Sequence, residues 1–260
     1  MNVITMTFNL RVNVDSDGSN AWPHRKHRAA AVITDASPDL FGTQEGSGAM
    51  LRDLDEALPE YGRIGTGRMG QGDRDGEHCA IYYKQADFSI LQEGQFWLSE
   101  TPEKPGSLGW DGSYPRICTW GLFQSTKDTD VRFYVVNTHF DHMGAVARQE
   151  SAKLILDHIQ RLRKEEALPV ILMGDLNAGP GEAEIAILRD ALQDAYELLD
   201  EPAGRTFHDF KGGLEGEPID YIFTTHDVEM VETIIYRDTY DGAYPSDHYP
   251  VSMKWRAASV

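Results

Sequence analysis

A chain of 260 residues, 41% of them hydrophobic, can bury a substantial core, and the lack of a repeat, a low-complexity linker or a change in composition predicts one domain over residues 1–260. The formal charge of −18 argues against a broad basic surface for nucleic acid, and no apolar run approaches the roughly 20 residues that span a bilayer. Two cysteines, Cys79 and Cys118, give no disulfide framework, and no signal-peptide pattern follows Met1, so we expect a monomeric protein of the cytoplasm with reduced thiols.

The first half of the chain predicts more strands than helices. Residues 3–9 alternate apolar and polar side chains, as in a strand, and a helix is expected to begin within residues 20–23 and to end before Pro38. A buried strand is predicted at 39–45 and a short helix at 50–58. Four further strands, at 79–84, 88–98, 116–123 and 131–138, have no helix between them and are expected to be antiparallel. Residues 99–114, which contain several Pro and Gly, predict a long irregular loop.

The second half contains the longest predicted helix and the most apolar predicted strand. Apolar residues at helical spacing predict a helix at 145–165, and the apolar run at 170–173 predicts a buried strand that ends at Gly174. A helix at 182–199 and strands at 218–225 and 228–236, which we expect to pair, precede a last strand at 249–255. Because the helices fall mainly in two places, the pattern predicts two packed sheets with helices outside each.

One glycine-rich segment matches the GxGxxG pattern of dinucleotide-binding proteins. The segment is Gly65-Thr-Gly-Arg-Met-Gly70, and the pattern binds a pyrophosphate only when a helix begins within the glycines. The residues that follow, Gln71 to Gly76, predict more loop instead of a helix. We therefore expect a surface loop or a rim over the functional site.

Two polar residues follow the apolar strand at 170–173. Asp175 and Asn177 are two positions apart, and on a strand such residues point to the same side, so a carboxylate and an amide would lie next to each other. A carboxylate can take a proton from water while an amide orients the water or an oxyanion. Alternatively, Asp and Asn only begin a turn that Gly179-Pro180-Gly181 completes.

Other predicted strands also end in polar residues that suit metal-assisted phosphoryl transfer. These residues are Asn9, Glu45, His139, Asp220, Asp247 and His248. Carboxylate and amide oxygens such as those of Glu45, Asp247 and Asn9 are the ligands that Mg²⁺ and Mn²⁺ prefer. Two histidines supply hydrogen-bond donors for phosphate oxygens, and a carboxylate such as Asp220 can fix the tautomer of one of them. We therefore expect these side chains to line one cleft.

Six short motifs, in this order, resemble those of the endonuclease/exonuclease/phosphatase superfamily. They are FNLR at 8–11, TQE at 43–45, NTHFDH at 137–142, GDLN at 174–177, IDYIF at 219–223 and SDH at 246–248. The resemblance extends from residue 3 to residue 255. It implies an α+β fold like that of deoxyribonuclease I, a four-layer α/β/β/α sandwich of two mainly antiparallel sheets flanked by helices. The segment with Trp22-Pro-His-Arg25 is similar to small stand-alone bacterial members.

The resemblance also implies a role for each matching residue. Metal ligands would be Glu45, Asn9 and Asp247, with Mg²⁺ or Mn²⁺ as the cofactor. Asp175 and Asn177 would orient the attacking water, and His248, paired with Asp220, would contact the scissile phosphate; whether Asp175 or His248 is the base stays open. His139 would stabilise the pentavalent phosphorus. Arg116 is a candidate for a contact with a substrate phosphate, and Asp141 and His142 are candidates for other substrate contacts.

The expected activity is hydrolysis of a phosphodiester or phosphomonoester of a small soluble molecule. Nuclease activity on DNA or RNA is the alternative, although no Lys-rich or Arg-rich insertion for a nucleic-acid backbone is evident. A protein that binds a phosphorylated ligand without catalysis would not need a base. The segment His139-Phe-Asp-His142 resembles part of the HxHxDH zinc motif of metallo-β-lactamase-like hydrolases, but Asn137 stands in place of the first histidine.

Overall fold

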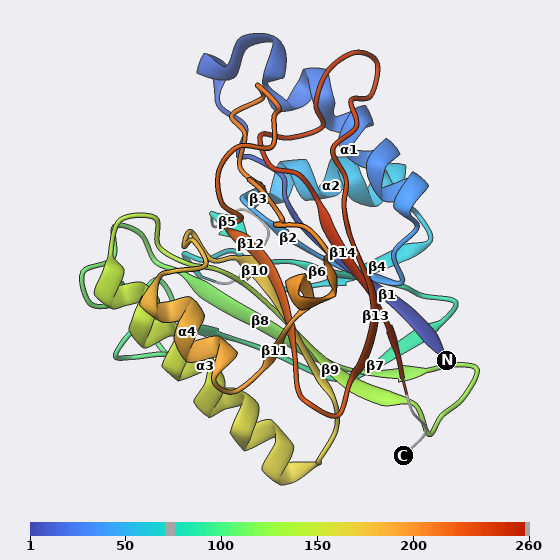
Figure 1. Cartoon of the computed structure of the whole chain (residues 1–260), viewed down its shortest axis with the longest axis vertical. Coiled ribbons are helices and arrows are strands. Elements are labelled where there is room, and N and C mark those ends of the chain that lie inside the picture. Colours follow the sequence, from blue (N-terminus) through green and yellow to red (C-terminus); the bar gives the residue numbers. More distant parts are fainter. Residues whose placement is uncertain (71–75, 258–260) are drawn as a thin grey trace.

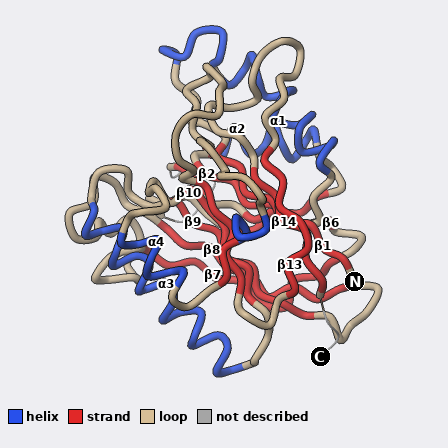
Figure 2. Tube along the Cα trace, in the orientation of Figure 1, coloured by secondary structure: helices blue, strands red, loops and turns tan. Residues whose placement is uncertain are grey.

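The computed structural model describes residues 1–70 and 76–257 and has four layers. Two six-stranded sheets pack face to face, and helices cover the outer face of each (Figure 1). In Figure 2 the strands form a central block, with the helices at its two sides. The α+β fold with an α/β/β/α order of layers, expected from the sequence, is thus confirmed.

The first sheet has the strand order β13-β14-β1-β2-β6-β4. Its strands are β1 (Asn2–Asn9), β2 (Leu40–Gln44), β4 (Tyr61–Ile64), β6 (Ile81–Lys84), β13 (Glu229–Ile235) and β14 (Val251–Arg256). The central strands β1 and β2 are parallel, with Thr5 opposite Leu40 and Asn9 opposite Gln44. Because parallel strands end at the same edge, this register brings Asn9 and the residue after Gln44 together.

The second sheet has the order β11-β12-β10-β9-β8-β7. Its strands are β7 (Phe88–Trp97), β8 (Ile117–Ser125), β9 (Arg132–His139), β10 (Val170–Asp175), β11 (Gln193–Asp194) and β12 (Asp220–Thr224). Strands β9 and β10 are parallel, and β12 runs antiparallel to β10. Asp175 therefore lies opposite His139 on one side and opposite Asp220 on the other.

The helices and the two sheets enclose three hydrophobic layers. Helices α1 (Trp22–Ala36) and α2 (Gly48–Ala57) pack on the first sheet, and α3 (Ala145–Glu165) and α4 (Ala183–Arg189) pack on the second. Between the sheets lies a third layer, which includes the fully buried Phe133 and Trp255 in an edge-to-face contact at 4.9 Å. Two 3₁₀ helices, η1 (Asp15–Asn20) and η2 (Ala195–Leu198), and a two-stranded pair, β3 (Gly46–Ser47) with β5 (Glu77–His78), complete the described structure.

Several predicted elements agree closely with the structure. Helix α3 has the bounds expected from its apolar spacing, and β1 and β10 differ from the predicted strands by one or two residues. Residues 99–114 are irregular, as predicted, and connect β7 to β8. Both cysteines are buried and free. Over the described residues, none of the helices combines the length and the apolar character that crossing a membrane requires.

Two predictions of secondary structure and pairing are wrong. The helix expected at 182–199 ends at Arg189 and is followed by β11 and η2, because Gln193 and Asp194 pair with β12 instead of extending the helix. The strands expected at 218–225 and 228–236 do not pair, since β12 joins the second sheet and β13 pairs with β14 in the first. The antiparallel pairing predicted for the four strands at 79–84, 88–98, 116–123 and 131–138 is confirmed: β6 is antiparallel to β2 and β4 in the first sheet, and β8 is antiparallel to β7 and β9 in the second.

The GxGxxG segment forms no phosphate-binding turn. Residues 65–70 follow β4 as a loop without a helix, and the backbone oxygen of Arg68 accepts a hydrogen bond from Trp97 Nε1 at 2.6 Å. The loop predicted over Gln71 to Gly76 lies outside the described residues except for Gly76. The alternative of a loop at the rim of the site is supported, because Arg68 lines the same cavity as the predicted site residues Glu45 and Asp175.

Candidate active site

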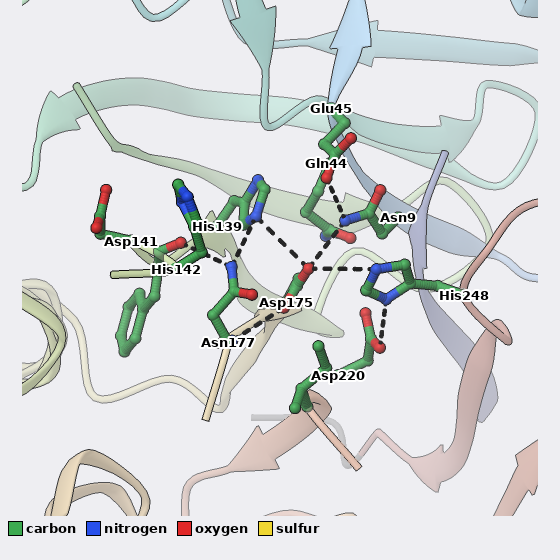
Figure 3. A network of polar contacts seen from close by, with 12 residues as sticks. Asn9, Gln44, Glu45, His139, Asp141, His142, Asp175, Asn177, Asp220 and His248 are labelled. Atoms are coloured by element: carbon green, nitrogen blue, oxygen red, sulfur yellow. Dashed lines mark hydrogen bonds and ion pairs between the residues drawn. The ribbon is translucent and has the colours of Figure 1, made fainter. Parts of the chain in front are cut away.

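The polar residues predicted from the strand ends meet where the two sheets open at one end. Asn9 ends β1, Glu45 follows β2, and Asp247 and His248 precede β14, so these four belong to the first sheet. The second sheet contributes three residues, which are His139 at the end of β9, Asp175 at the end of β10 and Asp220 at the start of β12. Figure 3 shows that Asn9, His139 and His248 surround the Asp175 carboxylate.

An amide connects the two carboxylates nearest the floor of the site. Asn9 Nδ2 donates hydrogen bonds to Glu45 Oε1 at 3.1 Å and to Asp175 Oδ2 at 2.9 Å, while Asn9 Oδ1 accepts one from the Arg11 backbone N–H at 2.8 Å. The other oxygen of Glu45 accepts a hydrogen bond from the Val12 N–H at 2.7 Å. Burial opposes the charged form of Glu45, but the Val12 N–H, His248 and Asn9 together lower its pKa. Glu45 is therefore held as a carboxylate.

The backbone of Glu45 adopts a left-handed conformation. Its φ is +62°, which for a residue with a Cβ costs on the order of 1–3 kcal/mol. Strain of this kind persists only where the surrounding structure enforces it, and here Glu45 stands between β2 and the β3–β5 pair. The conformation directs the Glu45 carboxylate toward Asn9 and Asp175 (Figure 3).

The donor set at this end of the site fits a hard divalent cation. Glu45, His139 and Asp175 each offer one ligand atom, and these atoms lie within 4.8 Å of one another. Asp247 is buried next to them, and burial together with the nearby Glu45 raises its pKa although His248 lowers it. Carboxylates and an amide crowded together suit Mg²⁺ or Mn²⁺, which prefer oxygen ligands.

A histidine and a carboxylate form a buried pair across from Glu45. His248 Nδ1 lies 2.9 Å from Asp220 Oδ2, and His248 Nε2 lies 3.8 Å from Asp175 Oδ2. Burial opposes the charged form of His248, but Asp220, Asp175 and Asp247 raise its pKa to about 10. Burial and the nearby Asp220 raise the pKa of Asp175 to about 7. The site thus pairs a protonated imidazole with a carboxylate whose pKa is near neutrality.

Asn177 and His139 form the opposite side of the site. Asn177 Nδ2 lies 3.0 Å from His139 Nε2, which lies 3.5 Å from Asp175 Oδ2. Burial, with Arg116 and His248 nearby, holds the pKa of His139 well below 6.5. Asp175 and Asn177 do come together, but not through strand alternation: β10 ends at Asp175, Asn177 has a φ of +48°, and its N–H donates to Asp175 Oδ1 at 2.9 Å.

These residues border a cavity of about 470 Å³. Of the predicted site residues, the cavity is lined by Glu45, His139, His142, Asp175, Asn177, Asp247, His248 and Arg116. Asn9 and Asp220 lie behind them, one under Glu45 and the other under His248.

Asp141 does not line the cavity with the other predicted substrate contacts. Only 2% of it is exposed, and its carboxylate accepts hydrogen bonds from the backbone N–H groups of Ser113, Tyr114, Met143 and Gly144. Those groups outweigh the effect of burial and lower the pKa of Asp141 to about 2. The geometry favours a role in holding two loops together over a direct contact with substrate.

Sequence reasoning missed part of the cavity wall. Arg11, Arg68, Glu77, Tyr114 and Phe207 also line it. Arg68 lies in the glycine-rich segment and Tyr114 at the end of the irregular loop; the sequence predicts both segments as loops but singles out neither side chain. Long irregular loops next to a site often carry recognition residues, so this signal was available.

Arg25 is a second omission and lies beneath the site. It is fully buried, and its guanidinium donates to backbone oxygens of Asn20 at 2.7 Å, Arg11 at 2.5 Å and Pro245 at 3.2 Å, and also to Leu10. These oxygens belong to the segments that follow Asn9 and precede Asp247. Arg25 therefore connects the two chain segments that carry Asn9 and Asp247.

Comparison with known proteins identifies similar sequences and structures. The sequence profile of the Endonuclease/Exonuclease/phosphatase family matches residues 6–248. A crystal structure of an endonuclease/exonuclease/phosphatase family protein from Bacteroides thetaiotaomicron is 35% identical, with a TM-score of 0.92 and coverage of 98% of each chain. A comparison with curated protein sequences gave no significant match.

Two further similar structures differ in their sequence identity to this chain. A mannosyl-6-phosphatase from Bacteroides thetaiotaomicron is 35% identical, with a TM-score of 0.92, and the match covers 98% of this chain and 99% of that one. The catalytic domain of human Nocturnin is 18% identical, with a TM-score of 0.77 and coverage of 99% and 94%. At that identity Nocturnin shares the fold alone.

Proposed function

The chain belongs to the endonuclease/exonuclease/phosphatase family, and we propose that it hydrolyses a phosphomonoester of a small soluble molecule with Mg²⁺ or Mn²⁺ as its cofactor. Members of this family are hydrolases that act on phosphoesters. The proposal adds a substrate class and a metal to that family assignment, and it assigns roles to the residues of the cavity.

One observation carries the proposal: Asp175 lies at the centre of the polar network. Its Oδ2 lies 2.9 Å from Asn9 Nδ2, 3.5 Å from His139 Nε2 and 3.8 Å from His248 Nε2. A buried carboxylate with a raised pKa between two imidazoles is suited to proton transfer at neutral pH. A site that only bound phosphate would not need such a group.

The cation would be held by Glu45, Asp247 and Asn9. When bound, it supplies positive charge to phosphate oxygens, which stabilises the charge of the transition state. In the structure the Asn9 amide nitrogen faces Glu45 and Asp175 and its oxygen faces the Arg11 N–H, so a role as a ligand would require the amide to turn and to exchange these hydrogen bonds for a bond to the cation.

The chain's own side chains would perform the proton transfers. Asp175 would orient a water molecule and take its proton as the water oxygen attacks phosphorus in line with the ester bond. His248, held protonated by Asp220, would donate a hydrogen bond to a phosphate oxygen, as would Asn177. The bond between phosphorus and the ester oxygen breaks, the leaving alkoxide takes up a proton from solvent, and Asp175 returns the proton that it took from the water to solvent. We favour Asp175 over His248 as the base because His248 is the protonated partner of Asp220.

A small substrate is supported by charge and by similarity. The net charge of −18 disfavours the long polyanion of a nucleic-acid backbone, although D. rerio TDP2, whose structure holds a single-strand DNA product, shares the fold. The cavity of about 470 Å³ has the size of a small-molecule site. The relative at 35% identity is a mannosyl-6-phosphatase, so sugar phosphates are the first class to test.

The test is an assay of metal-stripped protein with and without added Mg²⁺ or Mn²⁺. The substrates are p-nitrophenyl phosphate, sugar phosphates, bis-p-nitrophenyl phosphate, a plasmid and a short RNA. We expect metal-dependent release of inorganic phosphate from the monoesters. Cleavage of plasmid or RNA with no turnover of any monoester would refute the proposal and favour a nuclease.

Two substitutions and a matched control separate this activity from a contaminant. Asp175→Asn and His248→Gln should each lower kcat on the order of 10²- to 10⁴-fold, as expected for loss of a proton-transfer or charge-stabilising group. Asp157→Asn changes an exposed carboxylate on α3, away from the cavity, and should retain the wild-type rate. Wild-type rates for both site variants would contradict the assigned roles.

A further inference from the structure

One side of the cavity consists of residues that the proposed reaction does not use. Arg68, Glu77, Tyr114, Arg116 and His142 all line it, next to His139 and Asn177. Because they border the site of the scissile phosphate, they are placed to contact the group that the phosphate is attached to. This surface is called the Tyr114 wall below and comprises Arg68, Tyr114, His142 and Arg116.

Four planar side chains follow one another in the Tyr114 wall. The guanidinium carbon of Arg68 lies 5.1 Å from the centre of the Tyr114 ring. The rings of Tyr114 and His142 stack at 5.9 Å with 23° between their planes. Arg116 Nη2 then lies 3.3 Å from His142 Nδ1. Stacking fixes the two rings, so their polar edges are presented at set positions.

The wall is preformed, because buried groups hold both segments that carry it. The Asp141 carboxylate accepts hydrogen bonds from Ser113 and Tyr114 on one segment and from Met143 and Gly144 on the other. A carboxylate that accepts several N–H groups is a strong clamp between segments. Tyr114 and His142 are thus kept together before any substrate arrives, which lowers the entropy lost on binding.

Each arginine of the wall already has a carboxylate partner. Arg68 Nη1 and Nη2 donate to the two oxygens of Glu77, both at 2.9 Å, and Arg116 Nε lies 3.6 Å from Asp141 Oδ2. The positive charge of the wall is therefore largely compensated. A second phosphate on the substrate would gain little from these arginines, and it would also meet Glu77 in the same cavity.

The groups left for a ligand are those that match hydroxyls. Tyr114 is 51% exposed, and within the described part of the chain no hydrogen-bond partner is found for its hydroxyl or for His142 Nε2. A phenol hydroxyl both donates and accepts, and so does a sugar hydroxyl, whereas a phosphate dianion only accepts. The arrangement is therefore complementary to a neutral group with several hydroxyls.

We infer that Tyr114 and His142 form a leaving-group subsite that binds the hydroxyls of a phosphomonoester whose leaving group is uncharged and polyhydroxylated. This inference rests on the proposed function and narrows its substrate class to sugar or polyol monophosphates. Tyr114 and His142 determine specificity, and they take no part in proton transfer to or from the reacting atoms.

The test compares two monoesters that differ in hydroxyls. The kcat/KM for mannose 6-phosphate and for p-nitrophenyl phosphate, whose leaving group has no aliphatic hydroxyl, is measured for the wild type and for Tyr114→Phe. The substitution removes one hydroxyl and keeps the stacked ring. We expect the ratio of the two kcat/KM values to fall roughly 3- to 10-fold, the effect of one lost hydrogen bond. Tyr83→Phe, which alters a tyrosine outside the cavity, should leave the ratio unchanged.

Two outcomes with an active enzyme would overturn the subsite alone. One is an unchanged ratio in both Tyr114→Phe and His142→Ala. The other is a wild-type kcat/KM for fructose 1,6-bisphosphate that equals or exceeds the value for mannose 6-phosphate. Absence of hydrolysis of every monoester, p-nitrophenyl phosphate included, would instead overturn the proposed function, and the subsite with it.

Discussion

Replacing Asp141 with Asn should destabilise the protein in a way that depends on pH. The Asp141 carboxylate accepts four backbone N–H groups, from Ser113, Tyr114, Met143 and Gly144, at distances between 2.8 and 3.2 Å. The substitution keeps the shape of the side chain, removes its charge and places an NH₂ group where one oxygen was. The loss of charge gives the pH-dependent part of the effect.

The magnitude follows from the change in pKa on folding. Asp141 has a pKa of about 2 in the folded protein and an ordinary value of 3.8. This difference in pKa corresponds to about 2 kcal/mol of stability. Because the folded pKa is lowered, this stability is fully present above pH 3.8 and is lost as the pH falls through 2. The contribution should be about 2 kcal/mol at pH 7 and about 1 kcal/mol at pH 3.

Urea unfolding of wild type and Asp141→Asn, followed by tryptophan fluorescence between pH 7 and pH 3, measures this difference. The variant should have a lower free energy of unfolding than the wild type at every pH, and the difference between the two should decrease by roughly 1 kcal/mol from pH 7 to pH 3. Asp157→Asn, on an exposed position of α3, is the control for a change of charge alone. A difference in free energy of unfolding that stays constant with pH, or that increases in acid, would refute the role of the carboxylate in holding the two loops together.

Three more substitutions probe the backbone, the metal site and the support beneath it. Gly174→Ala should unfold or severely destabilise the protein, because a Cβ at this position would lie 2.1 Å from the Thr138 backbone oxygen. In the control Gly181→Ala the added Cβ meets no atom within 4 Å, so this variant should be tolerated. The thermal unfolding temperatures of the two variants are compared with that of the wild type. Glu45→Gln should weaken Mn²⁺ binding in a calorimetric titration and lower kcat/KM on the order of 10²- to 10⁴-fold, and unchanged binding would remove Glu45 from the ligand set. Arg25→Met should cost at least about 3 kcal/mol in urea unfolding, because it leaves several buried backbone oxygens without a donor, and a cost under 1 kcal/mol would contradict that role.

Local pattern was sufficient for the elements whose residues depend on their own neighbours in sequence. The helical spacing of apolar residues in α3 and the apolar run of β10 gave bounds close to those observed. Pro and Gly mark the ends of these elements, because their backbone restrictions act locally. The polar residues at strand ends, and the motifs they belong to, likewise identified most of the cavity: Glu45, His139, Asp175 and His248 all line it.

The pairing between strands could not be predicted from the local sequence pattern. Residues 182–199 have a helical composition, but Gln193 and Asp194 pair with β12, and only that distant strand supplies the partners. Strands β12 and β13 are separated by a short turn and yet belong to different sheets. A strand's preference for one sheet depends on the packing of its side chains between layers, which propensity alone does not contain.

The chemistry of the site was determined by the sequence, because the residue types and their order fix which donors and acceptors exist. Only the tertiary structure decided how they face one another. Asn9 and Asp175 are 166 residues apart and come within 2.9 Å because the ends of both sheets meet. The same packing turned Asp141 toward four backbone N–H groups and placed Tyr114 from the irregular loop in the cavity wall. The direction of a loop side chain is set by the contacts that surround it, and those contacts exist only in the folded protein.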